Sequence, residues 1–183
     1  MPLQHFSDHV LKMMNRQNDY KQAIALTEKI RKNYPKITLR TTLMVGFPGE
    51  TQKDYELLKA SVAQVKFDRL GVFAFSKEED TAAFLLDETV SEEEKLDRKQ
   101  EIMELQQEIS YQKNQEKVSQ TFKVLIDEYD ESIFMYIGRS YEYAPDSDGS
   151  IYIASENQLK IGEFYDVKIV KAEFHDLMGE VVS

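Results

Sequence analysis

The chain has no cysteine and no tryptophan among its 183 residues, and only three histidines. Without cysteine, these residues form no disulfide and supply no thiolate to a metal ion or an iron–sulfur cluster. No apolar run approaches the roughly 20 residues that a membrane-spanning helix requires, and the first ten residues lack the basic and apolar regions of a secretory signal. Hydrophobic residues still make up 42% of the chain, which is enough for a packed core. We therefore expect a folded cytoplasmic protein.

The chain also has fewer basic than acidic side chains, and most of the excess negative charge lies in one segment. The net charge is −10, of which residues 118–183 contribute −8 through 5 basic and 13 acidic side chains. Such a segment repels a phosphate backbone, because nucleic-acid affinity comes from Lys and Arg displacing counterions. The acidity therefore favours a basic protein over nucleic acid as the partner, unless it serves only solubility.

Helical periodicity marks three segments of the chain. Ser7 is placed to cap a short helix that carries apolar residues on one side. A second helix begins near Tyr20 and ends before Pro35, which cannot continue it. A long third helix follows Ser91, with acidic residues at its positive end, and extends to about Val118. Its apolar stripe is expected to be a packing face and consists of Leu96, Ile102, Leu105 and Ile109.

Two predicted strands enclose a further helix. Residues 37–45 are rich in β-branched and apolar types, and residues 67–76 form a second buried strand. Thr51 and Asp54 resemble a capping box that opens the helix between them, with Asp in the position usually held by Glu. Strand, helix and strand in this order indicate an α/β unit with a parallel sheet. Two parallel strands cannot bury both of their faces, so we expect the unit to be part of something larger.

The pattern changes after Thr121. Short alternating runs separated by turn residues predict four or five strands, at the spacing of a small antiparallel barrel or sandwich. This part of the chain holds ten of the twenty aromatic residues. Aromatic rings on one face of a small barrel can stack nucleobases, although core packing is the commoner reason for them. The sequence alone leaves both alternatives open.

The stretch ITLRTTLMVGFPGET, residues 37–51, ends an apolar strand in a turn that is suited to holding a ligand. Gly46 brings bare backbone to the carboxyl end of the strand, where open α/β sheets bind ligands. Pro48 and Gly49 fit the central positions of a type II turn, and Glu50 offers one charge to a ribose hydroxyl or an ammonium group. The alternative is an ordinary connection between strand and helix.

The histidines give no second candidate site. His5 and His9 lie four residues apart, a spacing that suits a metal ion only if both stand on one helix. Because Ser7 is expected to cap that helix, His5 lies outside it, and we predict no metal site. The chain also has no Ser-His-Asp, H-E-x-x-H or phosphate-loop pattern.

Five segments occur in a fixed order along the chain: PLQHFSDHVLKMMNR, LRTTLMVGFPGET, FDRLGVFAFSKEEDT, MELQQEISYQKN and GRSYEYAPDSDG. Together they resemble the radical S-adenosylmethionine (radical SAM) methylthiotransferases, and specifically the RimO branch, over nearly the whole chain. The tRNA-modifying MiaB branch is similar, but it typically has a PVQSGS-like start and lacks the GRS…AP…DG stretch. The RimO branch modifies an aspartate of a basic ribosomal small-subunit protein.

The resemblance implies an α/β region followed by an all-β one. Residues 1–90 would be the C-terminal half of a radical SAM barrel (a partial TIM-type barrel), residues 91–118 a long connecting helix, and residues 119–183 a small OB-like antiparallel TRAM β-barrel. The family reaction uses S-adenosylmethionine and two iron–sulfur clusters, and each cluster needs thiolate ligands. We therefore predict no catalytic residue in this chain and no activity from these residues alone. They would supply part of the cofactor wall and the substrate-recognition barrel.

In this family the loop after the fifth barrel strand helps to bind S-adenosylmethionine, and MVGFPGE occupies that place. The family pattern G-x-I-x-G-x-x-E is altered here, because Thr42, Met44 and Gly49 replace its first Gly, its Ile and its Glu. An inward Arg40 would bind the cofactor carboxylate or the substrate aspartate; a structural salt bridge is the alternative. The predicted cofactor-binding residues are Gln4, Arg40, Thr42, Val45, Gly46, Phe47, Pro48, Gly49, Glu50, Phe73, Phe75 and Ser76.

The TRAM domain of RNA-modifying relatives would be basic, whereas the acidic segment here favours a basic ribosomal protein, with no membrane partner. Two alternatives stay open: a MiaB-like tRNA methylthiotransferase, and a non-catalytic adaptor whose barrel binds a basic protein or RNA. The chain departs from the family at Asp80, Ala82 and Ser119, where Gly, Pro and Gly are more common. The predicted substrate-recognition residues are Arg139, Ser140, Tyr141, Tyr143, Asp146 and Asp148.

Overall fold

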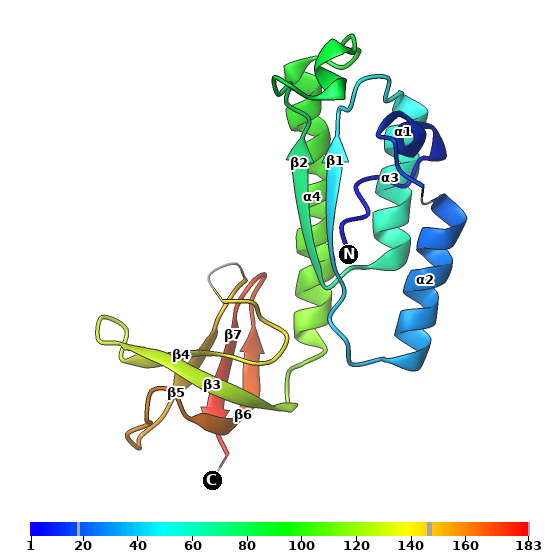
Figure 1. Cartoon of the computed structure of the whole chain (residues 1–183). Coiled ribbons are helices and arrows are strands. Elements are labelled where there is room, and N and C mark those ends of the chain that lie inside the picture. Colours follow the sequence, from blue (N-terminus) through cyan, green and yellow to red (C-terminus); the bar gives the residue numbers. More distant parts are fainter. Residues whose placement is uncertain (18, 146–147, 183) are drawn as a thin grey trace. The chain divides into compact units, whose positions relative to one another are not determined.

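A computed structural model describes residues 1–17, 19–145 and 148–182 of the chain. It divides into two compact units, Met1–Ile109 and Ser110–Ser183, and the division falls within the longest helix, α4 (Glu92–Gln115) (Figure 1). The domain boundaries expected at residues 90 and 118 stay a prediction. Among the described residues, no helix combines the length and the apolar character that crossing a bilayer requires.

The first unit is built on a parallel pair of strands. β1 (Arg40–Val45) pairs with β2 (Arg69–Ala74), and α3 (Gln52–Val65) connects them. Gln4 forms a further parallel bridge to β1 through hydrogen bonds of 2.9 and 2.7 Å with the backbone of Thr42 and Met44. The predicted order of strand, helix and strand, and the parallel sheet, are therefore confirmed.

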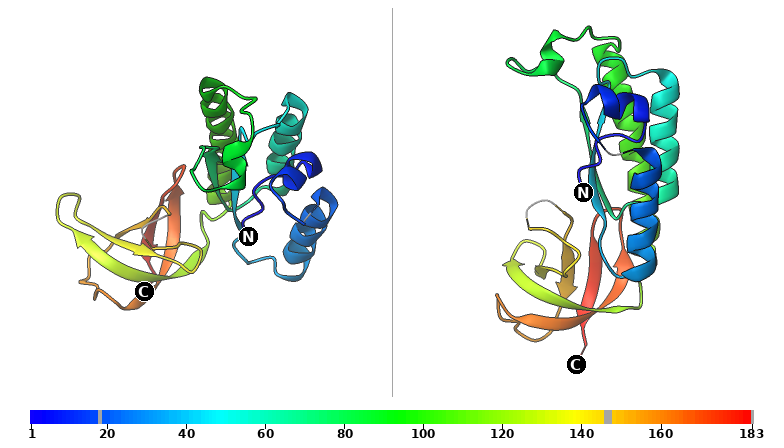
Figure 2. Two further views of the ribbon diagram at one scale, coloured as in Figure 1. Left: turned by 45° about the horizontal axis from the view of Figure 1, so that its top comes forward. Right: turned by 45° about the vertical axis from the view of Figure 1, so that its right-hand side comes forward.

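Helices cover one face of this sheet. Residues alternate along β1, so that Thr41, Leu43 and Val45 are buried while the residues between them are more exposed. The buried face packs against α3, α4 and α2 (Tyr20–Asn33) in one core, and Figure 2 shows α2 and α3, in blue and cyan, along one side of the strands. Two short helices, α1 (Asp8–Met13) and the 3₁₀ helix η1 (Ala82–Leu85), lie in the connections.

Two details of the helices differ from the sequence predictions. Ser7 precedes α1 as expected, but it makes no cap hydrogen bond, because its hydroxyl donates to Asp54 instead. On α4, Ile102 is buried in the core as predicted, whereas Leu96 is 58% exposed. The residues that α4 buries near its start are Lys95 and Arg98.

The second unit is a closed five-stranded barrel in the order β3-β4-β5-β7-β6. This closure confirms the predicted OB-like barrel. The predicted antiparallel pairing is wrong for one pair, because β5 and β7 run parallel. Between these two strands the chain runs back along the barrel as β6, so β7 starts from the same end of the barrel as β5. The strands are β3 (Thr121–Asp130), β4 (Met135–Arg139), β5 (Ile151–Ala154), β6 (Phe164–Ala172) and β7 (Leu177–Val181).

Aromatic residues of the barrel serve more than one purpose. Tyr136 and Tyr143 are buried in the barrel core, and the Tyr136 hydroxyl accepts a hydrogen bond from Leu159 N at 3.0 Å. Phe134 and Tyr141, by contrast, are 78% and 67% exposed. Core packing therefore explains only part of the aromatic content.

Candidate functional site

The chain turns sharply at the carboxyl end of β1. Glu50 N donates a hydrogen bond to the Phe47 carbonyl at 2.9 Å, and Gly49 has a φ of +85°, as the third residue of a type II turn requires. The predicted type II turn, with Pro48 and Gly49 at its centre, is confirmed. Gly46, just before it, also has a positive φ of +72°, which glycine adopts without strain.

The Glu50 carboxylate closes this turn from inside the protein. Its Oε2 accepts a hydrogen bond from Gly46 N at 2.9 Å and lies 3.4 Å from His5 Nε2, while Oε1 forms an ion pair with Arg98. The side chain is fully buried. We expected Glu50 to offer its charge to a ligand; both of its oxygens instead have protein partners, because a buried carboxylate is costly unless it is paired.

Lys95 of α4 lies directly against Gly46. A Cβ at Gly46 would come within 2.2 Å of Lys95 Cγ, so a side chain at this position would displace the lysine. The Lys95 ammonium donates to Glu88 at 2.7 Å and to Glu92, and it lies 5.4 Å from the centre of the Phe75 ring. Burial lowers the pKa of Lys95, but the hydrogen bonds to the two carboxylates outweigh it, so the pKa is above its ordinary value.

A second polar cluster fixes the start of α3 behind the turn. Thr51 and Asp54 form the predicted capping box, in which each side chain accepts a hydrogen bond from the backbone of the other. Asp54 also accepts from the Ser7 hydroxyl and lies 3.2 Å from His9 Nδ1. Burial raises the pKa of Asp54, but hydrogen bonds from Ser7, Thr51 and His9 outweigh it and hold the pKa below its usual range. The cluster thus joins the start of α1 to α3.

A pocket of about 310 Å³ opens beside the turn. Two predicted cofactor residues, Gln4 and Phe47, line it, together with Met44 of β1, which was not among the predicted residues. Its volume is at the lower end of the range for small-molecule sites. Further lining comes from α1 with the residues after it, and from the region of η1: Met13, Met14, Asn15, Arg16, Ala82, Ala83 and Leu86.

The other predicted cofactor residues lie around this pocket or away from it. Phe73 of β2 is opposite Met44 in the sheet register and is 58% exposed. Thr42 alternates with the buried residues of β1 and is half-buried, and Arg40 is exposed at the start of β1, the end away from the turn. Ser76 is exposed after β2. Gly49 is half-buried, and the buried members are Val45, Gly46, Pro48, Glu50 and Phe75.

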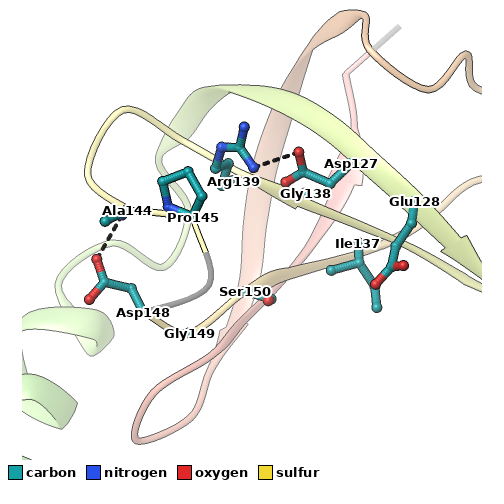
Figure 3. Close-up of a pocket in the computed structure, with 10 residues that line it drawn as sticks. All are labelled: Asp127, Glu128, Ile137, Gly138, Arg139, Ala144, Pro145, Asp148, Gly149 and Ser150. Carbon is teal, nitrogen blue, oxygen red and sulfur yellow. Dashed lines mark hydrogen bonds and ion pairs between the residues drawn. The ribbon is translucent and has the colours of Figure 1, made fainter.

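A second pocket, of about 360 Å³, lies on the barrel between β3, β4 and the segment before β5 (Figure 3). Arg139 donates to Asp127 at 2.7 Å, and Asp148 accepts from Ala144 N at 2.7 Å. With Glu128, three carboxylates and one guanidinium line the pocket, which is therefore acidic. Its other lining residues are Ile137, Gly138, Pro145, Gly149 and Ser150.

The predicted substrate-recognition residues are divided between this pocket, the core and the surface. Arg139 and Asp148 line the pocket, and Tyr141 is largely exposed. Asp146 lies outside the described residues. The buried members are Ser140 and Tyr143.

Sequence reasoning missed the two cations that support the turn. Lys95 and Arg98 precede Ile102 by seven and four residues, so they stand on the helix face that Ile102 buries. That spacing was a usable signal. The predicted packing face was built from apolar residues alone, so it included Leu96 and left out the neighbouring Lys95.

The residues beside the turn fit part of S-adenosylmethionine and do not fit an iron–sulfur cluster. Met44, Phe47 and Leu86 provide apolar surface for a purine, and Gln4 and Asn15 provide polar groups at its edge. A cluster takes thiolate ligands, and the chain contains no cysteine. Any thiolate ligands of a cluster must therefore lie outside these 183 residues.

Two protein families match separate parts of the chain. Residues 1–60 match the Radical SAM superfamily, and residues 118–182 match the TRAM domain. Among solved structures, coproporphyrinogen III oxidase (HemN) from Escherichia coli, a radical SAM enzyme, is similar with a TM-score of 0.52 and 26% identity. The similarity covers 62% of this chain and 27% of that one. The predicted fold class, part of a radical SAM barrel followed by a TRAM barrel, is confirmed.

Relatives named ribosomal protein uS12 methylthiotransferase RimO match the chain from end to end. The protein from Acetivibrio thermocellus is 42% identical over all of this chain and 40% of its own length. Those from Desulfitobacterium hafniense and Flavobacterium johnsoniae are 45% and 46% identical, over 100% and 98% of this chain and 41% of their own lengths. The chain spans about two-fifths of the length of these curated relatives. Along its whole length the chain is similar to radical SAM methylthiotransferases named RimO.

Proposed function

We propose that this chain takes part in adding a methylthio group to an aspartate of ribosomal protein uS12 by radical SAM chemistry. The observation that carries the proposal is the 42–46% identity, over 98–100% of the chain, to proteins named for that reaction. The turn at the carboxyl end of β1 supports it, since the turn lies within the segment that matches the Radical SAM superfamily.

In this proposal the pocket beside the turn binds part of S-adenosylmethionine. Met44 and Phe47 form the apolar wall, Gln4 contributes a polar group, and the exposed ring of Phe73 extends the wall along β2. When bound, S-adenosylmethionine would supply the carbon radical of the reaction after it accepts one electron from an iron–sulfur cluster whose ligands lie outside these residues. The residues of this chain bind and orient it, and the missing side chain of Gly46 leaves room for the Lys95 stem that packs against the turn.

The barrel is the part that we propose to bind the substrate protein. Residues 118–183 have a net charge of −8, and the barrel pocket is lined by three carboxylates and one guanidinium. Such a surface attracts Lys and Arg side chains of a basic protein and repels a phosphate backbone. A tRNA substrate, the alternative, would have to bind a segment with 5 basic and 13 acidic side chains.

The test is binding of the chain to purified uS12 and to tRNA over a series of salt concentrations. The informative variant is Glu128→Lys, because Glu128 is exposed and lines the barrel pocket. Its matched control is Glu156→Lys, which makes the same charge change on the exposed segment between β5 and β6.

We expect wild type to bind uS12 and not tRNA. Glu128→Lys should weaken uS12 binding roughly fivefold more than the control does at low salt, and the gap should narrow as salt screens the charges. Equal effects of the two variants would contradict recognition at this pocket. A preference for tRNA would move the chain to the MiaB-like alternative.

A further inference from the structure

Two cationic side chains of α4 are buried beside the turn at the carboxyl end of β1. The side chains of Lys95 and Arg98 are only 1% and 6% exposed, although Lys and Arg are rarely buried unless they are paired. Neither residue lines the pocket of about 310 Å³. Ligand contact therefore does not explain why the protein buries two charges at this place.

Arg98 fixes the orientation of the Glu50 carboxylate. Its guanidinium pairs with Glu50 through one terminal nitrogen and with Glu94, one helical turn earlier, through the other. Its central carbon lies 5.0 Å from the centre of the Tyr55 ring. These contacts come from three elements and leave the guanidinium little freedom to move. Because Glu50 Oε2 accepts from Gly46 N at 2.9 Å, Arg98 indirectly determines where the Gly46 amide points.

Lys95 precedes Arg98 by three residues on α4 and supports the same connection between β1 and α3. Its aliphatic stem occupies the space that a side chain of residue 46 would need, and its ammonium lies over the Phe75 ring. Phe75 in turn contacts Phe47 edge to face, with 5.2 Å between ring centres. Phe47 lines the pocket. Lys95 therefore backs both the backbone of the turn and the aromatic wall.

We propose that Lys95 and Arg98 are positioning residues for the ligand of this pocket, which act through Gly46, Glu50 and Phe75. The inference rests on the proposed function, in which that ligand is S-adenosylmethionine. A turn held in its bound geometry before the ligand arrives loses less conformational freedom on binding. Removing the support should therefore weaken binding even at temperatures where the variant is fully folded.

The experiment compares Arg98→Gln with Arg98→Lys. Its control is Lys59→Gln, which removes an ion pair of 2.8 Å between Lys59 on α3 and Glu101 on α4, the two helices that flank the site. Each protein is titrated with S-adenosylmethionine by calorimetry well below its unfolding temperature. Hydrogen exchange of the Gly46 amide is measured without ligand.

We expect Arg98→Gln to weaken binding roughly tenfold, the scale set by losing one hydrogen bond to a charged group, and to speed Gly46 exchange by a similar factor. Arg98→Lys should recover part of both, since lysine keeps the charge but loses the forked geometry. Lys59→Gln should change either quantity less than about twofold, because exposed ion pairs contribute little.

Unchanged affinity and unchanged Gly46 exchange in Arg98→Gln would overturn the proposal. A lower unfolding temperature with unchanged affinity would also overturn it, because it would show that the residue only stabilises the fold. If wild type binds no S-adenosylmethionine while Arg98→Gln still speeds Gly46 exchange, the cofactor assignment fails and the positioning of the turn by Arg98 stands.

Discussion

At the scale of single residues, Asp54 makes the start of α3 sensitive to acid. Its carboxylate accepts hydrogen bonds from Thr51 and Ser7, and its pKa is held below the ordinary value of 3.8. A carboxyl group whose pKa is lower in the folded state stabilises the fold fully above its unfolded pKa. That stabilisation is lost as the pH falls through 3.8 toward the lower folded value.

We therefore expect Asp54→Asn to lower the free energy of unfolding by about 1–2 kcal/mol at pH 7, because it removes the negative charge that accepts the hydrogen bonds from Thr51 and Ser7. The difference from wild type should shrink as the pH falls from about 5 to 3. Thermal melts across this range measure it. The control is Asp97→Asn, at an exposed position on α4, whose free energy of unfolding should stay close to that of wild type at every pH. If the difference between Asp54→Asn and wild type did not change with pH, the lowered pKa of Asp54 would be contradicted.

Backbone conformation gives a second prediction at this scale. Asp80 and Ser119, two positions where the family more often has glycine, have φ values of +64° and +72°. An L-residue in this region costs roughly 1–2 kcal/mol relative to its preferred conformations, and Asp tolerates it better than Ser. Ser119 lies in the turn that follows α4 and leads into β3.

Ser119→Gly should accordingly raise the free energy of unfolding by about 0.5–1 kcal/mol, after allowing for the greater freedom of glycine in the unfolded chain. Urea denaturation followed by circular dichroism would detect it. The neighbouring change Gln120→Gly serves as the control, since the φ of Gln120 is not positive, and it should destabilise. Destabilisation by both changes would show that the Ser119 backbone is not strained.

At the scale of elements, α4 buries a stripe that is half polar. Ile102 has no exposed surface and Leu96 is 58% exposed, although an apolar-only pattern places both on the packing face. We expect Ile102→Ala to cost about 2–4 kcal/mol through lost burial and a residual cavity, and Leu96→Ala less than about 0.5 kcal/mol. Chemical denaturation of the two variants checks this. Similar losses would mean that α4 is rotated relative to this description.

The same helix shows what a sequence can and cannot predict. The positions of strands and helices followed from periodicity, and the turn at Pro48-Gly49 followed from glycine and proline chemistry. The partners of Glu50 did not, because Arg98 lies far along the chain and ion pairs leave no periodic trace. The β5–β7 pairing was also out of reach, since alternation marks a strand but does not say which neighbour it joins or in which direction.

At the scale of the whole molecule, each unit has its own hydrophobic core, one around β1, β2 and their helices and one inside the barrel. Charge is distributed as unevenly as fold, with −8 of the net −10 in residues 118–183. Charge of one sign on a compact barrel keeps it soluble and speeds encounters with an oppositely charged partner. The rest of the chain, residues 1–117, is nearly neutral by comparison, with 18 basic and 20 acidic side chains.

The closed order of the barrel strands has a consequence for the time the chain needs to fold. β3 pairs with β6, bringing Thr121 opposite Lys168, and the circle is complete only when β7 joins β5 and β6. Pairings between segments so distant in sequence require entropically costly loop closure and make folding slow. On the ribosome, β3 and β4 emerge before β6 and β5, the strands that pair with their free edges. A newly made barrel therefore passes through an interval with open strand edges, at which it is prone to pair with other chains.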